Sequence, residues 1–398
     1  MTPLRAQARW WRATAIGAAL LLASVGAAHA GPAPAAPPQG AAGRGKTPPA
    51  PAKGLVKLSE PWPDPEVIRQ RHADAENRRL FQSADPLTFT LTANFNAVNK
   101  DRNENSTKRF PATLVVTGDN VKSGPLHVQL GTRGHFRLRQ TSCSFVPLRV
   151  EFDRQNAAGT MFDGQKALKL VTHCRDNKEY EQYTLREYLV YRIFNLLTPR
   201  SFRARLAKAT YVDPASGKPP ITRYGMFLDD DDDVARRMDG RVAELFNASF
   251  KELDSESTTL MFLFEYMIGS TDLSIIKLHN VRLVQDRARV LYPVPYDFDL
   301  AGLVDTSYAL VDKRLGLTSV RDRLYRGPCR TEAELEPALE KFRAKKSEVM
   351  ALYDSLPDLD AAYRRDARKY LEELYSLISR PDRVKKALVD GCKRADGM

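Results

Sequence analysis

The sequence predicts an α+β protein with two lobes, a β-rich N-terminal lobe and a helical C-terminal lobe. Short segments of alternating apolar and polar residues, separated by turn residues, run through residues 87–152 and predict strands. One long apolar helical pattern, residues 180–197, is embedded in this β-rich half. From residue 229 onward helical patterns dominate. Strands followed by helices, rather than a regular alternation of the two, are typical of α+β folds.

The first residues are expected to lie outside the folded domains. Three arginines precede an apolar stretch at residues 13–25, and Ala28-His29-Ala30 resembles a cleavage site. This pattern predicts a signal peptide over residues 1–30, with an uncleaved anchor as the alternative. Residues 31–58 are rich in Pro, Ala and Gly and predict a linker. We therefore expect a periplasmic or secreted protein without a transmembrane segment after signal cleavage.

The remaining chain divides into an N-terminal lobe, residues 59–228, and a C-terminal lobe, residues 229–398. Period-two alternation and flanking turn residues predict strands in the first lobe. These strands are expected at 87–95, 112–116, 126–130, 135–138, 148–152, 167–172, 204–212 and 224–228. Helical periodicity and a turn flanked by apolar runs predict the second lobe. It is expected to contain helices at 245–250, 258–268, 332–352, 359–378 and 381–389, and a hairpin at 283–294.

Composition and charge narrow the classes of partner. The chain has 398 residues, of which 43% are hydrophobic and 28% charged, an ordinary globular balance. Its net charge of +12 is spread over both halves. A nucleic-acid-binding protein would be expected to cluster its basic residues beside stacking aromatic residues. We therefore expect a solvated basic surface and no nucleic-acid partner, while attraction to nucleotides or anionic envelope polymers stays open.

The four cysteines predict two disulfides, because an even count in an exported protein is typical of an oxidising compartment. Four cysteines allow three pairings. Cys143–Cys174 and Cys329–Cys392 are favoured, since each pair would then lie within one lobe. A zinc site is the weaker alternative, because the sequence contains no CxxC spacing.

The candidate metal-binding residues lie in the segment TDLSIIKLHN…YPVPYDFDLAG. An apolar helix is expected to end at Gly269, and a loop then carries Asp272 and Asn280. Asp297 and Asp299 follow the predicted hairpin. Mg²⁺ prefers oxygen ligands and is usually bound by one or two carboxylates together with substrate phosphates. The arrangement therefore predicts a site for magnesium held against the phosphates of a nucleotide.

The order of these residues resembles kinase-like folds. Lys169 lies in a predicted strand, Glu187 in the following helix, and the Asp…Asn loop and the DFD motif come later. GSTDLSIIKLHN followed by YPVPYDFDLAG is similar to the CotH-type (spore coat protein H) atypical kinases, over roughly residues 130–302. The gap from Asp272 to Asn280 is eight positions (280 − 272), against five in ordinary protein kinases. A glycine-rich GxGxxG loop is missing, and Gly131-Thr-Arg-Gly134 is the nearest candidate.

The resemblance implies a role for each residue that would contact the nucleotide or the acceptor. Lys169 would contact the α- and β-phosphates of ATP, and Glu187 would hold Lys169. Asp272 would accept or orient the proton of the acceptor hydroxyl. Residues 224–228 and the start of the acidic run after them would form the hinge, whose backbone groups bind the adenine.

The resemblance also implies the metal ligands and the reaction. Asn280 and Asp297 would bind Mg²⁺ or Mn²⁺, and Asp299 would be a second ligand or would support the first. The implied activity is transfer of phosphate from ATP to an envelope or secreted protein acceptor.

The position of Glu187 on its helix supports a buried role independently of the resemblance. At 100° per residue, several aromatic residues share its face, and a carboxylate among them needs a cation or hydrogen-bond donors. Lys169 is one candidate partner, and Arg192 or an arginine of the sheet is another. Glu181, on a different face, is the alternative to Glu187. Lys169 could also simply point outward from an alternating strand.

The remaining polar residues have plainer interpretations. Asp272 could cap a turn after Ser270-Thr271. His279 is expected to be packed and hydrogen-bonded rather than bound to a metal. The run Asp229–Asp233 is expected to be a solvated loop that caps a helix beginning near Val234.

Two further functions stay open at this point. One is a kinase-like module that binds a ligand or has a structural role without catalysis, because the Asp-to-Asn gap is long and the glycine-rich loop is missing. The other is an envelope-polymer-binding protein in which the acidic cluster holds Ca²⁺.

Overall fold

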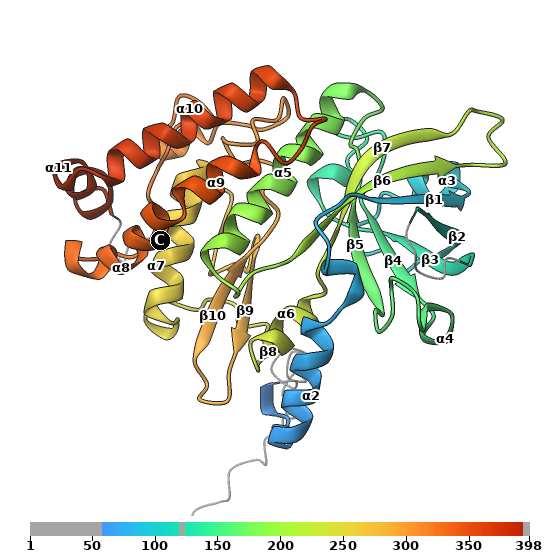
Figure 1. Ribbon diagram of the computed structural model, residues 1–398, viewed down its shortest axis with the longest axis horizontal. Helices are drawn as coiled ribbons and strands as arrows, with labels where there is room; N and C mark the ends of the chain where they lie inside the picture. The colour runs from blue at the N-terminus through green and yellow to red at the C-terminus, as the bar shows by residue number, and fades with distance from the viewer. Residues whose placement is uncertain (1–57, 119–123, 393–398) are drawn as a thin grey trace, which may run out of the picture. The chain divides into compact units, whose positions relative to one another are not determined.

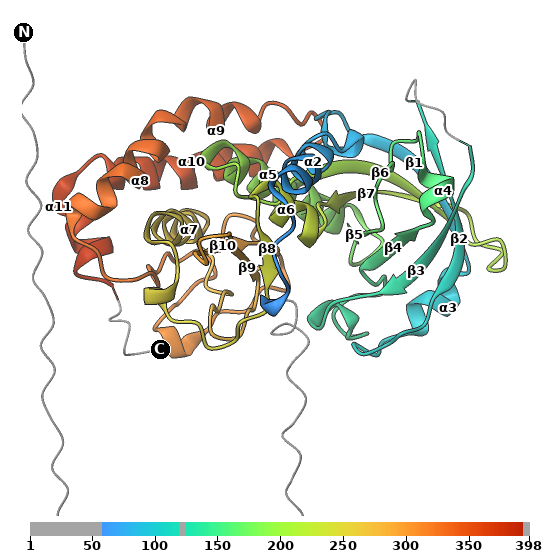
Figure 2. The same cartoon turned by 90° about the horizontal axis from the view of Figure 1, so that it is seen from below.

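The computed structural model describes residues 58–118 and 124–392 of the chain. The predicted signal peptide and all but the last residue of the predicted linker lie outside the described residues. The described part contains a closed seven-stranded barrel, a three-stranded sheet and ten α-helices (Figures 1 and 2). These residues belong to one compact unit, so the division into two lobes stays a prediction.

The β-rich half forms the barrel, with strand order β1-β2-β3-β4-β5-β7-β6. Its strands are β1 (Leu87–Ala93), β2 (Phe110–Thr117), β3 (Leu126–Thr132), β4 (Leu148–Phe152), β5 (Ala167–Val171), β6 (Ala204–Val212) and β7 (Ile221–Leu228). Neighbouring strands pair antiparallel, except that β1 pairs parallel with β6 and closes the barrel. Alternate residues of β1 point inward, and Phe89 packs on Phe227 in the barrel core.

The predicted hairpin is confirmed and belongs to a small second sheet of order β10-β9-β8. The strands are β8 (Arg241–Ala243), β9 (Val281–Gln285) and β10 (Leu291–Pro295). The prediction of a helix at 245–250 is wrong, because these residues leave β8 and enter a turn. Asn247 has a left-handed backbone (φ 62°), which ends helical geometry, and the side chain of Phe246 is exposed.

Helix α5 (Lys178–Leu197) connects the barrel to the helical part of the molecule. Asn177 caps it by accepting a hydrogen bond from the backbone N–H of Tyr180. The helix is buried on most of its surface and contacts β7 on one side and α9 on another. It therefore confirms the predicted helix at 180–197.

The C-terminal helices pack around α7 (Ser255–Ile268), which is almost entirely buried. Helix α7 ends at Gly269 as predicted; its φ of 66° and the close approach of Tyr370 both exclude a side chain there. The helices that follow are α8 (Glu332–Ala344), α9 (Lys346–Leu352), α10 (Ala361–Ile378) and α11 (Pro381–Val384), with a π-helical turn at Lys385–Val389. The helix predicted at 332–352 is thus interrupted at Lys345.

Four shorter helices complete the described part. They are α2 (Pro65–Glu76), α3 (Phe95–Lys100), α4 (Arg154–Ala157) and α6 (Asp231–Arg237). The prediction of a strand at 135–138 is wrong, because Phe136–Leu138 forms a 3₁₀ turn between β3 and β4. This turn is part of the functional site described below.

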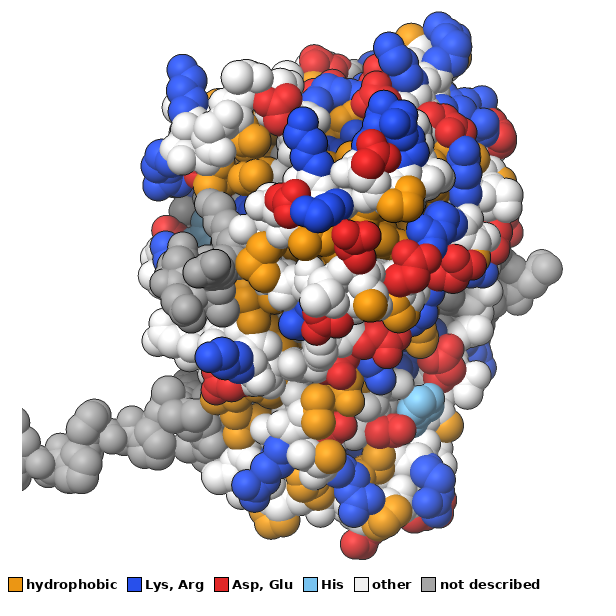
Figure 3. Space-filling view, turned by 90° about the vertical axis from the view of Figure 1, so that its left-hand side faces the viewer, with side chains coloured by type: hydrophobic (Ala, Val, Ile, Leu, Met, Phe, Trp, Pro, Cys, Tyr) orange, Lys and Arg blue, Asp and Glu red, His pale blue; other side chains and the backbone are white. Residues whose placement is uncertain are grey.

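Both predicted disulfides, Cys143–Cys174 and Cys329–Cys392, are confirmed. They fit a protein of an oxidising compartment. Within the described residues, we find no helix that is both long and apolar enough to cross a membrane. Figure 3 shows the face of the molecule at the α8 and α11 end, where acidic and basic side chains are interspersed.

Candidate functional site

The predicted catalytic, nucleotide-binding and metal-binding residues, except Glu187, line one cleft between the barrel and the β9–β10 hairpin. Its cavity has a volume of about 450 Å³. The barrel contributes Lys169 to its lining, and the segment after α7 contributes Asp272, Asn280, Asp297 and Asp299. These residues are far apart in the sequence, so their convergence is a property of the fold.

We call Asp272, Asn280, Asp297 and Asp299 the acidic wall of the cleft. The β9–β10 hairpin brings the residues before it and the residues after it together. Asn280 directly precedes β9, and Asp297 follows β10 by one residue. The backbone N–H of Tyr296 donates to the carbonyl of Asn280 over 3.0 Å, which extends the antiparallel pairing by one more step. The carboxamide and the carboxylate are thereby held at the same end of the hairpin.

The long gap between Asp272 and Asn280 forms a compact loop. Ser274 and His279 exchange two backbone hydrogen bonds of 3.1 and 2.9 Å. The side-chain amide of Asn280 donates to both the backbone carbonyl (2.7 Å) and the carboxylate (3.0 Å) of Asp272. The other carboxylate oxygen of Asp272 lies 2.9 Å from Nε2 of His279. The gap therefore still places Asp272 against Asn280.

His279 is hydrogen-bonded as expected, but it is half exposed rather than packed. Its hydrogen bond with the Asp272 carboxylate raises the pKa of the imidazole above its ordinary value. The Asp272 carboxylate thus favours the protonated form of His279 at the rim of the cleft.

Two of the candidate metal ligands have left-handed backbones. The φ angles are 53° at Asn280 and 65° at Asp297. Non-glycine residues adopt this region at an energetic cost, least for Asn and Asp, and such residues cluster at functional sites. The N–H of Asp297 donates to Oη of Tyr191 over 2.8 Å. Its carboxylate accepts no hydrogen bond from the described residues and is left to face the cavity.

Asp299 and Glu187 are buried carboxyl groups behind Asp297. Burial and repulsion by Asp297 raise the pKa of Asp299 to about 7, although Oη of Tyr308 donates to it over 3.1 Å. Burial, together with the charges of Asp299 and Asp297, raises the pKa of Glu187 well above its usual range, and Arg137 opposes this shift. These two carboxyl groups therefore keep their protons to higher pH than ordinary carboxyl groups do.

The expected partnership of Lys169 with Glu187 is wrong. The ammonium group of Lys169 instead forms an ion pair with Asp231 of α6 and lies near the rings of Phe202 and Tyr296. Asp231 also accepts a 2.8 Å hydrogen bond from Nε of Arg282. The side chain of Lys169 extends from β5 toward the N-terminus of α6, so it meets Asp231 and not Glu187.

The electrostatics of this ion pair are consistent with a tightly held contact. Burial would raise the pKa of Asp231, but the charges of Lys169 and Arg282 outweigh it and lower the pKa to about 2. Burial also lowers the pKa of Lys169; Asp231 opposes this, and Arg282 and Arg133 add to it. Ion pairs held away from water are screened less than surface ones.

The two alternative pairings, Glu181 with Lys169 and Glu187 with Arg192, do not form among the described residues. Glu181 accepts a 3.0 Å hydrogen bond from the backbone N–H of Tyr224, and Arg192 donates to Oη of Tyr188. Glu187 has no ion-pair partner among the residues that the structure describes. Its nearest positive charges in the cleft are Arg137 and Arg133.

The acidic run at 229–233 caps a helix, as expected, but it is not a solvated loop. Asp230 is the N-cap of α6. Asp229 is fully buried and pairs with Arg237 (2.7 Å), and Asp233 pairs with Arg78 (2.7 Å). The run therefore holds α6 in place through buried ion pairs with Arg237 and Arg78.

A smaller recess of about 210 Å³ adjoins the cleft at Lys169, which lines both. Ala167, Val242 and the residues 229–232 line this recess. It is the place where the resemblance to kinases implied a hinge.

Sequence reasoning missed Arg133, Arg137 and Arg282, which all line the cleft. Of the segment RGHFR at 133–137, the sequence predicts only 135–137 to lie in a strand, and Arg133 belongs to the nearest candidate for a glycine-rich loop; the two arginines are the available signal. Arg282 lies within the predicted hairpin but was not singled out, because a single basic residue in a strand has no distinctive pattern.

The acidic wall offers carboxylate and amide oxygens to a metal ion. Within the described ranges, no group of three or more His, Cys, Asp or Glu side chains is arranged to hold a metal ion. Asp297 and Asp299 provide two carboxylates, and Asn280 provides an amide oxygen. This set fits a hard cation that takes its remaining oxygen ligands from phosphate and water.

Glu265 of α7 lies beneath the Asp272 loop and is predicted to make stability depend on pH. Burial raises its pKa to about 8; a hydrogen bond with Ser270 opposes the shift and the charge of Asp272 adds to it. Between pH 4.5 and about 8 the unfolded chain releases a proton that the folded chain keeps, so the free energy of unfolding falls as pH rises.

Replacing Glu265 by glutamine removes this titration. We expect the variant to gain stability over the wild type from pH 4.5 to 8, by at most about 5 kcal/mol. Urea unfolding at pH 5 and pH 8 measures the difference. Equal pH dependence in the two proteins would contradict the prediction.

No family model matches the chain, and no curated protein matches it in sequence. Among solved structures, the chain is similar to a Helicobacter pylori proinflammatory kinase, CtkA, with 12% sequence identity and a TM-score of 0.33. The match covers 61% of this chain and 88% of that chain. A similarity this distant assigns neither a class of protein to this chain nor a role to any of its residues. The resemblance to CotH-type kinases stays a prediction.

Proposed function

We propose that the protein is an exported, kinase-like phosphotransferase that binds ATP or another nucleoside triphosphate with Mg²⁺ or Mn²⁺. The observation that carries this proposal is the meeting of Lys169 with Asp272, Asn280, Asp297 and Asp299 around one cavity. Cations on the barrel wall and carboxylates on the opposite wall match the charges of a phosphate chain and its metal. Phosphoryl transfer needs such positioning and charge neutralisation more than covalent catalysis.

Each wall of the cleft has a role in this proposal. Asn280, Asp297 and Asp299 would hold the metal, which neutralises charge on the phosphates. Lys169 would contact phosphate after exchanging its bond to Asp231 for one to the substrate. The adenine base of the nucleotide would lie in the recess lined by Ala167 and Val242.

Asp272 would be the group that receives the acceptor's proton. Its carboxylate is partly exposed and held by His279 and Asn280. The acceptor oxygen bonds to the γ-phosphorus while the bond between that phosphorus and the bridging oxygen breaks. The hydroxyl proton passes to Asp272, and the nucleoside diphosphate leaves. An envelope or secreted protein is the acceptor class that suits an exported enzyme with two disulfides.

Replacing Asp272 by asparagine separates binding from transfer. We expect binding of ATP with Mn²⁺ to change less than roughly threefold, because the amide keeps most of the loop's hydrogen bonds, while phosphate transfer falls about 100-fold or more. Calorimetry measures binding, and transfer of radiolabelled γ-phosphate to the protein itself or to an envelope extract measures the reaction. A variant that transfers phosphate as fast as the wild type would refute this role of Asp272.

A second candidate function is nucleotide binding without transfer. It is favoured by the pairing of Lys169 with Asp231 and by the missing ion pair at Glu187. In that case the wild-type protein would bind ATP and Mn²⁺ but label neither itself nor an envelope extract. Label on a defined acceptor would exclude this candidate.

A further inference from the structure

We propose that Arg133 and Arg137 are the phosphate-binding groups of the cleft, and that the Cys143–Cys174 disulfide fixes the segment that carries them. This inference rests on the proposed function and deepens it. It assigns to an arginine-bearing segment the task that a glycine-rich loop would perform. We call residues 133–137 the arginine segment.

The two arginines line the cavity without an anionic partner. Among the described residues, the side chain of Arg133 forms no hydrogen bond or ion pair, and that of Arg137 donates only to the backbone carbonyl of Thr172. Nε of Arg137 is buried without a partner. Burial would lower the pKa of Arg137, but the charges of Asp299 and Glu187 help to raise it, so this guanidinium lies near carboxyl groups without forming a direct ion pair with a described residue. A guanidinium beside a cavity can bind an anion, and its planar set of donors matches phosphate oxygens in pairs.

The arginine segment cannot rely on regular secondary structure for its position. It follows β3 and enters the 3₁₀ turn at Phe136–Leu138. A single hydrogen bond of 3.1 Å, from the N–H of Arg133 to the carbonyl of Pro147, extends the pairing of β3 with β4. Beyond that point the segment is held by the pairing of His135 with Glu104, by the packing of the Phe136 ring on Tyr308, and by contacts of the residues that follow it.

Those contacts converge on the Cys143–Cys174 disulfide, which joins the end of the segment's loop to the residues after β5. Arg102 donates to the carbonyl groups of Leu138 (3.3 Å) and Cys143 (2.9 Å). Arg175, next to the second cysteine, donates to the carbonyl groups of Ser142 and Thr141 on the loop. The disulfide thus links the loop that carries Arg137 to the residues after β5, where the carbonyl of Thr172 accepts the hydrogen bond of Arg137.

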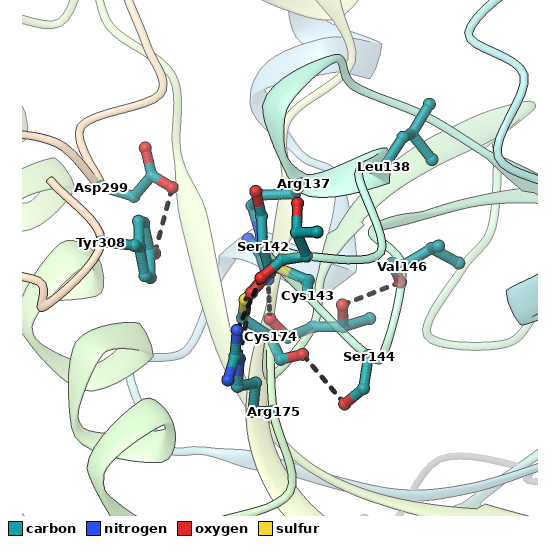
Figure 4. Close-up of a disulfide and its surroundings, with 12 residues drawn as sticks. Arg137, Leu138, Ser142, Cys143, Ser144, Val146, Cys174, Arg175, Asp299 and Tyr308 are labelled. Carbon is teal, nitrogen blue, oxygen red and sulfur yellow. Dashed lines mark hydrogen bonds between the residues drawn. A yellow bond between two sulfur atoms is a disulfide. The ribbon is translucent and has the colours of Figure 1, made fainter. Parts of the chain in front are cut away.

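The same disulfide also reaches the acidic wall. It packs with Tyr180, Tyr183 and Tyr308 in one small buried cluster. Oη of Tyr308 donates to Asp299, and Figure 4 shows this pair across from Arg137 and the disulfide. Loss of the disulfide would therefore loosen the arginine segment and also disturb the position of Tyr308.

Binding of inorganic tripolyphosphate and of ATP with Mn²⁺, measured by calorimetry on the full chain, tests the assignment of the arginines. We expect Arg133→Ala and Arg137→Ala each to weaken both interactions about tenfold or more, and Arg137→Lys to recover part of the loss. Arg139→Ala is the matched control, since Arg139 lies in the same loop, is exposed and does not line the cavity.

The disulfide is tested with two matched double variants. Cys143→Ser/Cys174→Ser should weaken tripolyphosphate binding by a similar factor, whereas Cys329→Ser/Cys392→Ser should leave it unchanged. Circular dichroism checks that each variant is folded, and Arg137→Lys, which keeps the charge, separates lost charge from lost structure.

The outcomes separate this inference from the proposed function. Wild-type affinity in both arginine-to-alanine variants would overturn the inference while leaving the function intact. Binding of tripolyphosphate but not of ATP with Mn²⁺, with loss in the arginine variants, would contradict the proposed function and support the inference. Equal losses in the two cysteine double variants would overturn the role of the disulfide.

Discussion

Replacing Asp297 by asparagine is expected to weaken binding of ATP with Mn²⁺ by roughly 100-fold. The carboxylate of Asp297 faces the cavity without a hydrogen bond from the described residues, so its charge is available to a cation. Asparagine keeps the size of the side chain and tolerates the left-handed backbone (φ 65°). The loss therefore reports the missing charge rather than a distorted fold. Calorimetry with nucleotide and metal together measures it.

Asp305 offers a matched control for this substitution. It also has a left-handed backbone (φ 53°), and its carboxylate lies 3.4 Å from Arg321 outside the lining of the cleft. Asp305→Asn should leave nucleotide binding unchanged. Unchanged affinity in Asp297→Asn, or an equal loss in both variants, would be inconsistent with a metal ligand at position 297.

Replacing Asp229 by asparagine is expected to cause the largest loss of stability. Asp229 is fully buried and accepts from Arg237 over 2.7 Å and from Arg203 over 3.4 Å. Removing its charge leaves the guanidinium of Arg237 without its anion, while Arg203 keeps Glu76 at 3.7 Å. Breaking a buried ion pair by removing one partner costs about 3–5 kcal/mol. Because asparagine still accepts a hydrogen bond, we expect about 3 kcal/mol, measured as the free energy of unfolding in urea.

Asp382 provides the comparison at the surface. Its side chain is exposed, and its carboxylate makes a long contact of 3.5 Å with Arg380. Asp382→Asn should change the free energy of unfolding by less than about 0.5 kcal/mol. If Asp229→Asn were as mild as Asp382→Asn, the acidic run would be the solvated loop that its composition suggests.

The strands and long helices were predictable because their side-chain periodicity is strong. The segment at 87–93 alternates throughout, and α7 is apolar and ends at a glycine that the left-handed cap requires. Short elements carry too few residues for a period to be read. The three-residue strand β8 and the 3₁₀ turn at Phe136–Leu138 were therefore missed. The parallel pairing of β1 with β6 depends on barrel closure and leaves no local signal.

The candidate site was predictable where its residues are close in sequence. Asn280 and Asp297 flank one hairpin whose pairing brings them together, and the short loop before it holds Asp272 against Asn280. Partners that depend on tertiary direction were not predictable. Nothing in the sequence distinguishes Glu187 from Asp231 as the partner of Lys169, because both are acidic residues downstream of the same strand. The cleft arginines were missed for the same reason, since their role depends on the loop that positions them.

The central claim is that this cleft binds a nucleoside triphosphate together with a divalent metal. Crystals grown with ATP and Mn²⁺ test it most directly, because manganese is located by its anomalous scattering. We expect an anomalous peak that contacts Asp297 and Asn280, with the triphosphate between it and the barrel wall. Nucleotide bound elsewhere, or a cleft without manganese at saturating ATP and Mn²⁺, would contradict it.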